Sequence, residues 1–179
     1  VTNGSFEAPG LEFRSVGAGQ TYGGWTCDGP NDIEFVRTEV NGGLPLLEAS
    51  GYDGQYWIDL CGVGQPSGIS QMVPTTVGQA YDVSFALAAN VWGSAAVFSM
   101  VVEWNNVVVG TFSHDTTGLD GAHMGWTRRD VTVVGTGNDR LEFRALTGFN
   151  ARGPAIDDVQ MVAVPTPGVL GALGVAGLA

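Results

Sequence analysis

Two adjacent carboxylates, Asp157 and Asp158, interrupt a stretch near the C-terminus, PAIDDVQMVAV, that otherwise has the pattern of a buried strand. A third acid, Glu7, follows the apolar Phe6 in the N-terminal stretch NGSFEAPG. Carboxylates that lie close together repel one another and raise one another's pKa, unless a cation lies between them. Calcium suits such a group because it takes only oxygen ligands, about six to eight of them, including backbone carbonyls of irregular turns.

These acids form one calcium site if the first and last strands of the domain lie side by side, as is common in a jelly roll. Glu7 would then meet one of the two aspartates near a sheet edge, and strand alternation would turn the other aspartate outward. The residues therefore predict calcium as a structural cofactor. The structural alternative is that Glu7 caps a turn and that Asp157 pairs with an arginine such as Arg152.

The sequence contains no arrangement that predicts catalysis. The two histidines, His114 and His123, lie in one polar loop, and adjacent Ser, His and Asp residues there cannot point at one another as a triad requires. The patterns G-x-S-x-G, HExxH and the P-loop are missing. Asp115 and Asp120 could complete a metal site with the histidines, but solvated loop side chains are the simpler interpretation. We therefore expect a protein that is not an enzyme.

Carbohydrate binding is the other chemistry that the side chains allow. Sugar rings stack on Trp or Tyr, while polar side chains nearby bind the hydroxyl groups. Trp92, in the loop NVWGS, is the best candidate for an exposed platform, and Tyr52 and Asn90 would share its rim. The alternative for these aromatic residues is ordinary packing or a protein interface. We expect two other tryptophans, Trp25 and Trp126, in the core.

The charge balance excludes one class of partner. The chain has seven arginines, no lysine and 18 acidic residues, for a net charge of −11. A nucleic-acid-binding protein needs a basic surface to neutralise phosphates, and this composition does not supply one. Most of the carboxylates are expected to form a solvated surface that favours solubility.

The cysteines and the N-terminus predict the compartment. Cys27 and Cys61 are in no CxxC pair, and we predict a disulfide between them, which needs an oxidising compartment; two buried thiols are the alternative. The chain begins at Val1, which predicts an N-terminus left by removal of a signal peptide. Together these features predict an extracytoplasmic protein.

Nine short runs with alternating or apolar patterns predict β-strands. Turn residues separate them, and WNN at 104–106 reads as a hairpin. No long helical pattern occurs in residues 1–164, so we predict an all-β domain there, an antiparallel two-sheet jelly-roll sandwich. The runs are 33–37, 55–60, 69–73, 80–88, 96–104, 107–112, 126–134, 140–146 and 155–164.

Residues 165–179 form a segment of different composition, VPTPGVLGALGVAGLA from Val164 onward. The uncharged run from Gly168 to Ala179 would span about 18 Å as a helix, whereas a bilayer core is about 30 Å thick. We expect an apolar anchor segment, too short to cross a membrane as it stands. Its contacts with a membrane or partner would come from Val169, Leu170, Leu173, Val175 and Leu178.

The order and spacing of several motifs resemble the bacterial choice-of-anchor C family, over about residues 3–164. They are NGSFE, GW at 24–25, IDLCG, GISQMVPTTVGQAYDVSFALAAN, GW at 125–126 and GPAIDDV. That group is similar to galactose-binding-like β-sandwiches and jelly-roll carbohydrate-binding modules. The resemblance implies a structural calcium held by Glu7 and Asp157, with Asp158 as a neighbour.

The tail resembles a PEP-CTERM sorting signal, in which a proline motif precedes an apolar helix and an arginine cluster. Here the motif is Pro165-Thr166-Pro167, and the arginine cluster is missing. The resemblance implies export and attachment in the periplasm or at the surface of a Gram-negative-type cell.

Two functions follow. The first is a non-catalytic module that binds envelope or extracellular polysaccharide. The second is a structural subunit of a membrane-associated or filamentous assembly that contacts other envelope proteins.

Overall fold

The computed structural model describes residues 1–8, 14–38 and 50–165. In these ranges the chain forms twelve β-strands, and no helix there is long and apolar enough to cross a membrane. The strands are β1 (Arg14–Val16), β2 (Thr21–Tyr22), β3 (Trp25–Asp28), β4 (Ile33–Arg37), β5 (Tyr56–Asp59), β6 (Gly68–Pro74), β7 (Ala80–Ala89), β8 (Val97–Trp104), β9 (Val107–Asp115), β10 (Thr127–Val134), β11 (Asn138–Ala145) and β12 (Pro154–Ala163).

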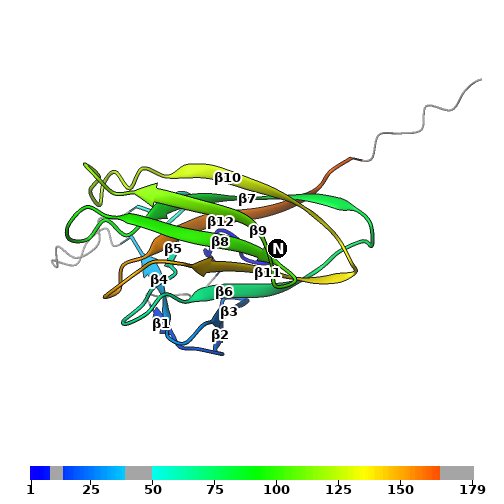
Figure 1. Cartoon of the computed structure of the whole chain (residues 1–179), viewed down its shortest axis with the longest axis horizontal. Coiled ribbons are helices and arrows are strands. Elements are labelled where there is room, and N and C mark those ends of the chain that lie inside the picture. The colour runs from blue at the N-terminus through cyan, green and yellow to red at the C-terminus, as the bar shows by residue number, and fades with distance from the viewer. Residues whose placement is uncertain (9–13, 39–49, 166–179) are drawn as a thin grey trace, which may run out of the picture.

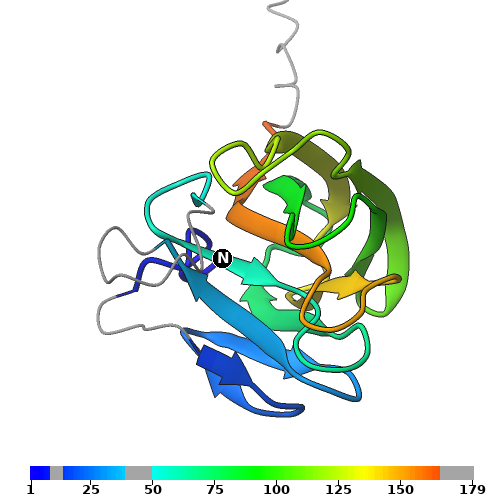
Figure 2. The ribbon, with the colours of Figure 1, turned by 90° about the vertical axis from the view of Figure 1, so that its left-hand side faces the viewer.

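The strands form two six-stranded antiparallel sheets that face each other (Figure 1). The first, called here the β12 sheet, has the order β1-β4-β5-β12-β7-β10. The second, the β11 sheet, has the order β2-β3-β6-β11-β8-β9. Figure 2 looks along the sandwich and shows both layers curving around a common interior. The predicted two-sheet jelly-roll sandwich is therefore confirmed.

All nine predicted strands are present within a few residues of their expected limits. The predicted hairpin between β8 and β9 is present too, with Asn105 and Asn106 at φ angles of 52° and 64°. Two consecutive positive φ angles match the twist of a tight hairpin, and asparagine tolerates them well. The sequence prediction missed β1, β2 and β3, which have only three, two and four residues. Such runs are too short to show alternation.

The main core lies between the sheets and consists of the inward residue of each alternating pair. In β7, Val83, Phe85 and Leu87 are buried on the inner side, as the alternation of this strand predicted. Phe85 packs edge-on against Phe112 and Phe143, with ring centroids 5.4 and 5.0 Å apart. Burial of each large apolar side chain contributes about 1.5–3 kcal/mol, so this layer supplies most of the folding energy.

A second, smaller apolar cluster lies on the outer face of the β12 sheet. Its buried members are Val36, Trp57, Ala88, Met124 and Ala155, with Val91 and Trp126 partly buried against them. Met124 and Trp126 belong to the connection between β9 and β10, which therefore packs on this face. The neighbours Tyr56 and Trp57 point to opposite faces of the sheet: Tyr56 belongs to the main core and Trp57 to the smaller cluster. Trp25 is in the main core, as predicted, and Trp126 is in the smaller cluster.

The cysteines are both free thiols, so the predicted Cys27–Cys61 disulfide is not formed. The Cys27 thiol, in β3, donates to the carbonyl of Asn31, with 3.3 Å between sulfur and oxygen. The Cys61 thiol, after β5, lies 3.6 Å from the carbonyl of Gly62. Burial raises the pKa of both thiols to about 11, which keeps them protonated and unreactive at neutral pH.

The N-terminal segment packs on β12, so the two ends of the domain meet as the sequence predicted. The Val159 amide donates to the carbonyl of Gly4 over 2.8 Å. A side chain at Gly4 would put its Cβ 1.9 Å from the Val159 carbonyl oxygen, so only glycine fits. At this place β12 has a bulge between Asp157 and Gln160, and Asp158 has a φ of 45°. Because of the bulge, Ile156 and Val159 both face the main core, and the two aspartates between them lie on the outer side of the sheet.

Candidate functional site

The described residues enclose a pocket of about 510 Å³ between two loops at one end of the sandwich. One loop follows β7 and supplies Val91, Trp92 and Gly93. The other connects β9 to β10 and supplies the remaining lining residues, Leu119, Asp120, Gly121 and Ala122. The walls are thus largely apolar, with a single charged side chain. Pockets with this balance bind small organic ligands.

Trp92, which the sequence nominated as a sugar platform, is the aromatic residue of the pocket and is partly exposed. Asp120 is the charged residue, and one of its carboxylate oxygens accepts the His123 amide over 2.9 Å. The His123 Nδ1 lies 3.0 Å from the same oxygen, and both side chains are largely solvent-exposed. The pocket therefore combines an indole ring with one carboxylate that can accept hydrogen bonds.

Asn90 lies beneath this pocket and does not line it. Its side-chain amide is buried and donates to Asp59 over 2.8 Å and to the Ala151 carbonyl over 2.9 Å. Its amide oxygen accepts the backbone N–H of Trp92 over 3.0 Å. The predicted contact group of Trp92, Tyr52 and Asn90 is thus divided, with Asn90 supporting the loop that carries Trp92.

Tyr52, the third predicted contact residue, lies outside the pocket lining. Its ring is 45% exposed and packs edge-on against Trp126, with centroids 6.4 Å apart. The Arg128 guanidinium lies 5.7 Å from the centre of the Tyr52 ring. Tyr52 therefore belongs to an aromatic and cationic patch over the outer cluster.

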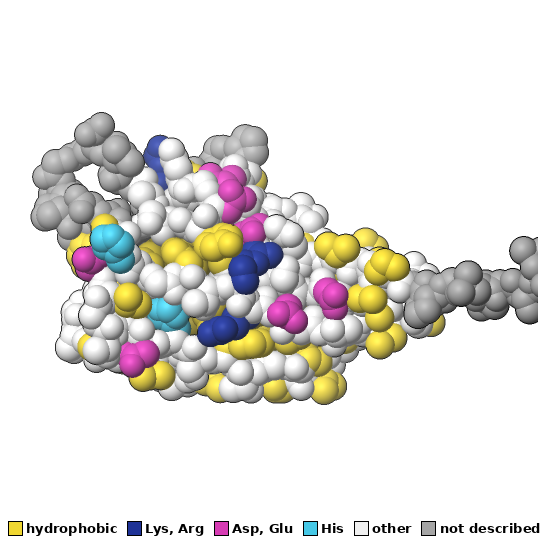
Figure 3. All heavy atoms as spheres, turned by 90° about the horizontal axis from the view of Figure 1, so that it is seen from above, with side chains coloured by type: hydrophobic (Ala, Val, Ile, Leu, Met, Phe, Trp, Pro, Cys, Tyr) yellow, Lys and Arg dark blue, Asp and Glu magenta, His cyan; other side chains and the backbone are white. Residues whose placement is uncertain are grey.

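Figure 3 looks onto the molecule over β10 and shows where the charged side chains lie on this face. The chain's two histidines lie near one end, and basic side chains lie among acidic and hydrophobic ones. No extended basic surface occurs on this face, which agrees with the net negative charge.

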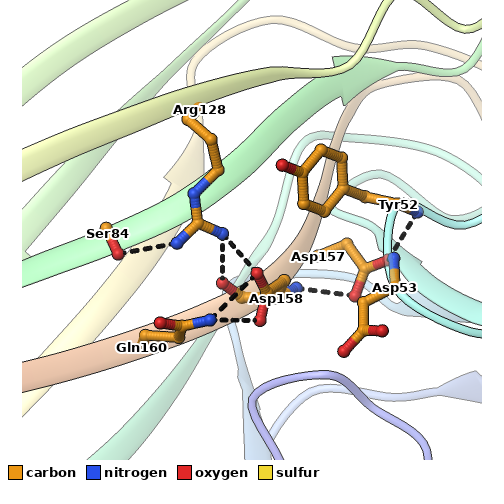
Figure 4. A network of polar contacts seen from close by, with 7 residues as sticks. All are labelled: Tyr52, Asp53, Ser84, Arg128, Asp157, Asp158 and Gln160. Atoms are coloured by element: carbon orange, nitrogen blue, oxygen red, sulfur yellow. Dashed lines mark hydrogen bonds and ion pairs between the residues drawn. The ribbon is translucent and has the colours of Figure 1, made fainter.

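Asp157 is fully buried and holds the turn that precedes β5 (Figure 4). One of its carboxylate oxygens accepts the amides of Tyr52 and Asp53 over 2.7 and 2.9 Å. The other accepts the amide of Asp158 over 2.6 Å. Burial raises the pKa of Asp157 to about 7, although these three hydrogen bonds oppose the shift.

Glu7 reaches the same turn from the N-terminal segment. One of its carboxylate oxygens accepts the amides of Gln55 and Tyr56, each over 2.6 Å. The backbone comes so close that a Cβ at Gly54 would lie 2.5 Å from the carboxyl carbon of Glu7. Glu7 and Asp157 therefore grip one turn, residues 50–56, from the two ends of the domain. We call this arrangement the carboxylate clasp.

Asp158 points away from the clasp and pairs with Arg128 of β10 (Figure 4). The same arginine donates to the Asp158 carbonyl over 3.0 Å and to the Ser84 hydroxyl over 2.8 Å. The Gln160 amide donates to both Asp158 carboxylate oxygens. Asp158 thus has a structural role that links β12, β7 and β10, and the pairing with arginine falls on Asp158 instead of Asp157.

The clasp brings together oxygen ligands of the kind that calcium takes, and it includes a buried acid with a raised pKa. However, both carboxylate oxygens of Asp157 and one of Glu7 accept backbone N–H groups. In residues 1–8, 14–38 and 50–165, no group of three or more acidic, His or Cys side chains is arranged to hold a metal. This includes His114, Asp115, Asp120 and His123. Calcium at Glu7, Asp157 and Asp158 therefore stays a prediction.

His114 is buried and lies in β9, not in a loop as the sequence predicted. Its Nε2 lies 3.0 Å from the Met124 carbonyl, and burial lowers its pKa. This contact holds the connection between β9 and β10 against the end of β9.

The predicted tail contacts, Val169, Leu170, Leu173, Val175 and Leu178, lie outside the described residues. The structure therefore does not test the anchor prediction.

The remaining pocket residues were not predicted. The sequence marked both loops, one through Trp92 and one through its polar composition. It carried no signal that Leu119, Gly121 and Ala122 would face Val91 and Gly93 across a cavity. The antiparallel pairings of β7 with β10 and of β8 with β9 bring these loops to the same end of the sandwich.

A protein-family comparison matches residues 1–162 to a family described as "Protein of unknown function (DUF642)". No curated protein matches the chain.

Several solved structures have the same fold. A family 35 carbohydrate-binding module from Clostridium thermocellum is 17% identical, covers 86% of this chain and 100% of its own, and has a TM-score of 0.52. TmCBM61 in complex with β-1,4-galactotriose is 17% identical, with coverages of 92% and 97% and a TM-score of 0.51. A cyclase from Fischerella sp. TAU in complex with 4-(1H-indol-3-yl)butan-2-one is 14% identical, with coverages of 94% and 98% and a TM-score of 0.55. At these identities the likeness establishes the fold.

Proposed function

We propose that this chain, which belongs to the DUF642 family, is a non-catalytic carbohydrate-binding module whose sugar site is the pocket beside Trp92. One observation carries the proposal. A partly exposed indole lines a largely apolar pocket of about 510 Å³, and one carboxylate lies in its wall. The apolar face of a sugar ring can stack on the indole while a hydroxyl group donates to Asp120.

The comparisons support this assignment without deciding it. Two of the similar structures are carbohydrate-binding modules, and one of them holds a galactotriose. A cyclase shares the fold as well, so the choice between binding and catalysis depends on the pocket residues. The only ionisable side chain in the wall, Asp120, is solvent-exposed, and a catalytic acid or base is usually tuned by burial or by neighbours. The lining therefore favours binding.

The charge of the pocket favours uncharged sugars. Its wall contains no arginine, Asp120 is acidic, and the whole chain carries a net charge of −11. An anionic sugar such as a uronate would meet repulsion both at the pocket and during its approach. We therefore assign neutral polysaccharides, such as a β-1,4-linked galactan, as the ligand class to test first.

The test is the affinity for neutral and anionic polysaccharides, measured by calorimetry or affinity electrophoresis. Trp92→Ala should weaken binding at least about tenfold, equivalent to about 1.4 kcal/mol, because the stacking surface is lost. Trp92→Phe should retain part of the affinity. Tyr52→Ala is the matched control, since this exposed aromatic residue lies outside the pocket lining and its loss should leave affinity unchanged. Equal binding by wild type and Trp92→Ala would refute the site.

The location of the protein belongs to the same proposal. We place the module outside the cytoplasm, attached to the membrane through residues 165–179, where envelope or extracellular polysaccharide is available. The test is fractionation of cells that produce the full chain, compared with a chain ending at residue 164. Release of only the shortened protein into the soluble fraction is the expected result.

The second candidate function, a structural subunit of an envelope assembly, is favoured by the edge strand β9. Val107, Val108 and Val109 are consecutive and exposed by 63%, 51% and 37% on this strand, which pairs on one side with β8. Residues 107–113 of β9 carry no charged side chain, and such a stretch of an edge strand is suited to protein contacts. Sedimentation of the purified chain separates the two functions, because a structural subunit would assemble in a concentration-dependent way without any sugar.

A further inference from the structure

A chain of buried polar contacts connects the interior of the β12 sheet to the loop that carries Trp92. It starts at Asp59, which ends β5 and is fully buried on the outer face of the sheet. One Asp59 oxygen accepts the Cys61 amide over 2.9 Å, and the other accepts the Asn90 side-chain amide over 2.8 Å. The Asn90 oxygen in turn accepts the Trp92 backbone N–H over 3.0 Å. Asp59 thus lies two hydrogen bonds from the proposed platform.

The backbone around Asp59 leaves room for its hydrogen bond with Asn90 across the sheet. β12 lies between β5 and β7, so the contact from Asp59 to Asn90 has to pass over the start of β12. Gly153 leaves the passage open, because a Cβ there would lie 3.0 Å from an Asp59 oxygen and 2.6 Å from the Cys61 Cβ. The Gly153 carbonyl also accepts the Asn90 backbone amide over 2.9 Å.

Arg152 holds the other side of the same loop. Its guanidinium lies 5.4 and 5.3 Å from the ring centres of Phe98 and Phe149, and it donates to the Ser94 carbonyl over 2.9 Å. Ser94 follows Gly93, which lines the pocket. The loop is therefore fixed at two points, through Asn90 before Trp92 and through Arg152 after it.

We propose that Asp59 and Asn90 are positioning residues for the sugar site, with ionised Asp59 orienting the Asn90 amide so that its oxygen holds Trp92 in place. This inference rests on the proposed function for its consequence in sugar binding. The orientation of the amide follows from the donors and acceptors. Asn90 must present its NH₂ group to Asp59 and the Ala151 carbonyl, and only then does its oxygen face the Trp92 amide.

Protonation of Asp59 would disturb this arrangement near neutral pH. Both carboxylate oxygens already accept N–H groups, so a proton on either oxygen would compete with one of them. Burial raises the pKa of Asp59 to about 7; the hydrogen bonds from Asn90 and Cys61 oppose the shift, Glu34 of β4 adds to it and Arg152 opposes it. Asp32 and the Cys61 thiol complete the titratable groups on this side. The Trp92 loop should therefore be held firmly above pH 7 and loosened below it.

The test observes Trp92 directly, without a sugar. The five tryptophans are replaced by 5-fluorotryptophan, and the ¹⁹F signal of Trp92 is assigned with Trp92→Phe. All variants carry His123→Gln, which removes the imidazole that contacts Asp120. Between about pH 5.5 and 8.5, the Trp92 signal should shift with a midpoint near 7, and Asp59→Asn should abolish the shift. The signal of Trp25, in the main core, is the control that should not move.

A second variant keeps Asp59 in place. Glu34→Gln removes a neighbouring negative charge, so it should move the Trp92 midpoint to lower pH, and this result decides the matter if Asp59→Asn does not fold. A Trp92 signal that ignores pH, or that titrates equally in Asp59→Asn, would overturn the proposal. Sugar affinity, expected to be at least about threefold weaker at pH 5.5 than at pH 8, is measured separately. A titrating Trp92 in a protein that binds no polysaccharide would refute the sugar site and leave the positioning role standing.

Discussion

At the scale of single residues, the carboxylate clasp shows how few atoms join the ends of the domain. Glu7 and Asp157 are 150 positions apart in the sequence. One carboxylate oxygen of each accepts two consecutive backbone amides of the same turn. Hydrogen bonds to a charged acceptor contribute about 1.5–3 kcal/mol each. The clasp therefore stabilises the domain whether or not an ion binds there.

The prediction of calcium at the clasp is tested by melting the protein with and without a chelator. If calcium binds Glu7 and Asp157, EGTA should lower the melting temperature by at least about 5 °C, because the ion stabilises only the folded state. Added calcium should restore it. Glu7→Gln should remove the response to calcium, while Asp130→Asn, at an exposed acid of β10, should preserve it. A melting temperature that does not respond to chelator would contradict the prediction.

Residue-level reasoning from the sequence succeeded where a side chain had one possible environment. Trp25 could only be buried, and the motif around Asp157 implied contact with the N-terminus. The prediction failed where the same residue type was compatible with two environments. Asn90 looked like a rim residue beside Trp92, but its amide turns inward to Asp59, and neither strand alternation nor loop position carries that information. The two cysteines were equally ambiguous, since a sequence spacing does not orient their sulfur atoms.

At the scale of elements, the bulge in β12 sets the direction of the two aspartates. Regular alternation would place Asp157 and Asp158 on opposite faces with extended backbone, but Asp158 has a φ of 45°. This conformation costs an ordinary residue about 1–2 kcal/mol and a glycine almost nothing. The bulge also lets Asp158 receive Arg128 from the edge strand β10.

Substitutions at Asp158 should separate the backbone cost from the ion pair. Asp158→Ala loses the pair with Arg128 and keeps a Cβ at a positive φ, so we expect a loss of about 1–3 kcal/mol in unfolding free energy. Asp158→Gly loses the same pair but relieves the backbone, and its loss should be smaller by about 1 kcal/mol. Urea denaturation measures both. Equal losses, or a larger loss for the glycine variant, would show that the bulge carries no strain.

The strand pattern was the most predictable part of the molecule. The run 80–88 alternates clearly, and a strand buried on one face requires that alternation. The three strands from Arg14 to Asp28 were missed because two to four residues cannot show a period. The pairing of loops around the pocket was missed for another reason. It follows from the order of strands in the β12 sheet, which depends on contacts between residues far apart in sequence.

At the scale of the whole molecule, three acids lie in the folded protein under conditions that oppose their ionisation. Burial is the largest cause in each case and raises the pKa of Glu34, Asp59 and Asp157 to about 7. In the unfolded chain such carboxyl groups titrate near 4. Between about pH 4 and 7 the folded state therefore binds more protons than the unfolded state, and its stability falls as the pH rises.

The free energy of unfolding should consequently be higher at about pH 5 than at pH 8, by more than about 1 kcal/mol. Urea denaturation in the presence of EDTA measures it, so that no cation offsets the buried charges. Glu34→Gln should reduce the difference. Asp139 acts in the opposite sense. Burial tends to raise its pKa, but hydrogen bonds from Thr136 and Thr75 hold it well below its usual value, and the stability it contributes is lost only in stronger acid. Stability that rises from pH 5 to 8 would contradict the prediction.

The place of β12 in its sheet has a consequence for folding during synthesis. This strand is the last of the described strands to be synthesised, yet it lies between β5 and β7 in the middle of the layer. Until it leaves the ribosome, its two neighbours have open edges rich in apolar residues, and the layer exists as two unjoined halves. Such a chain cannot fold stepwise while it is being made. The first sheet closes only once β12 is available to join β5 to β7.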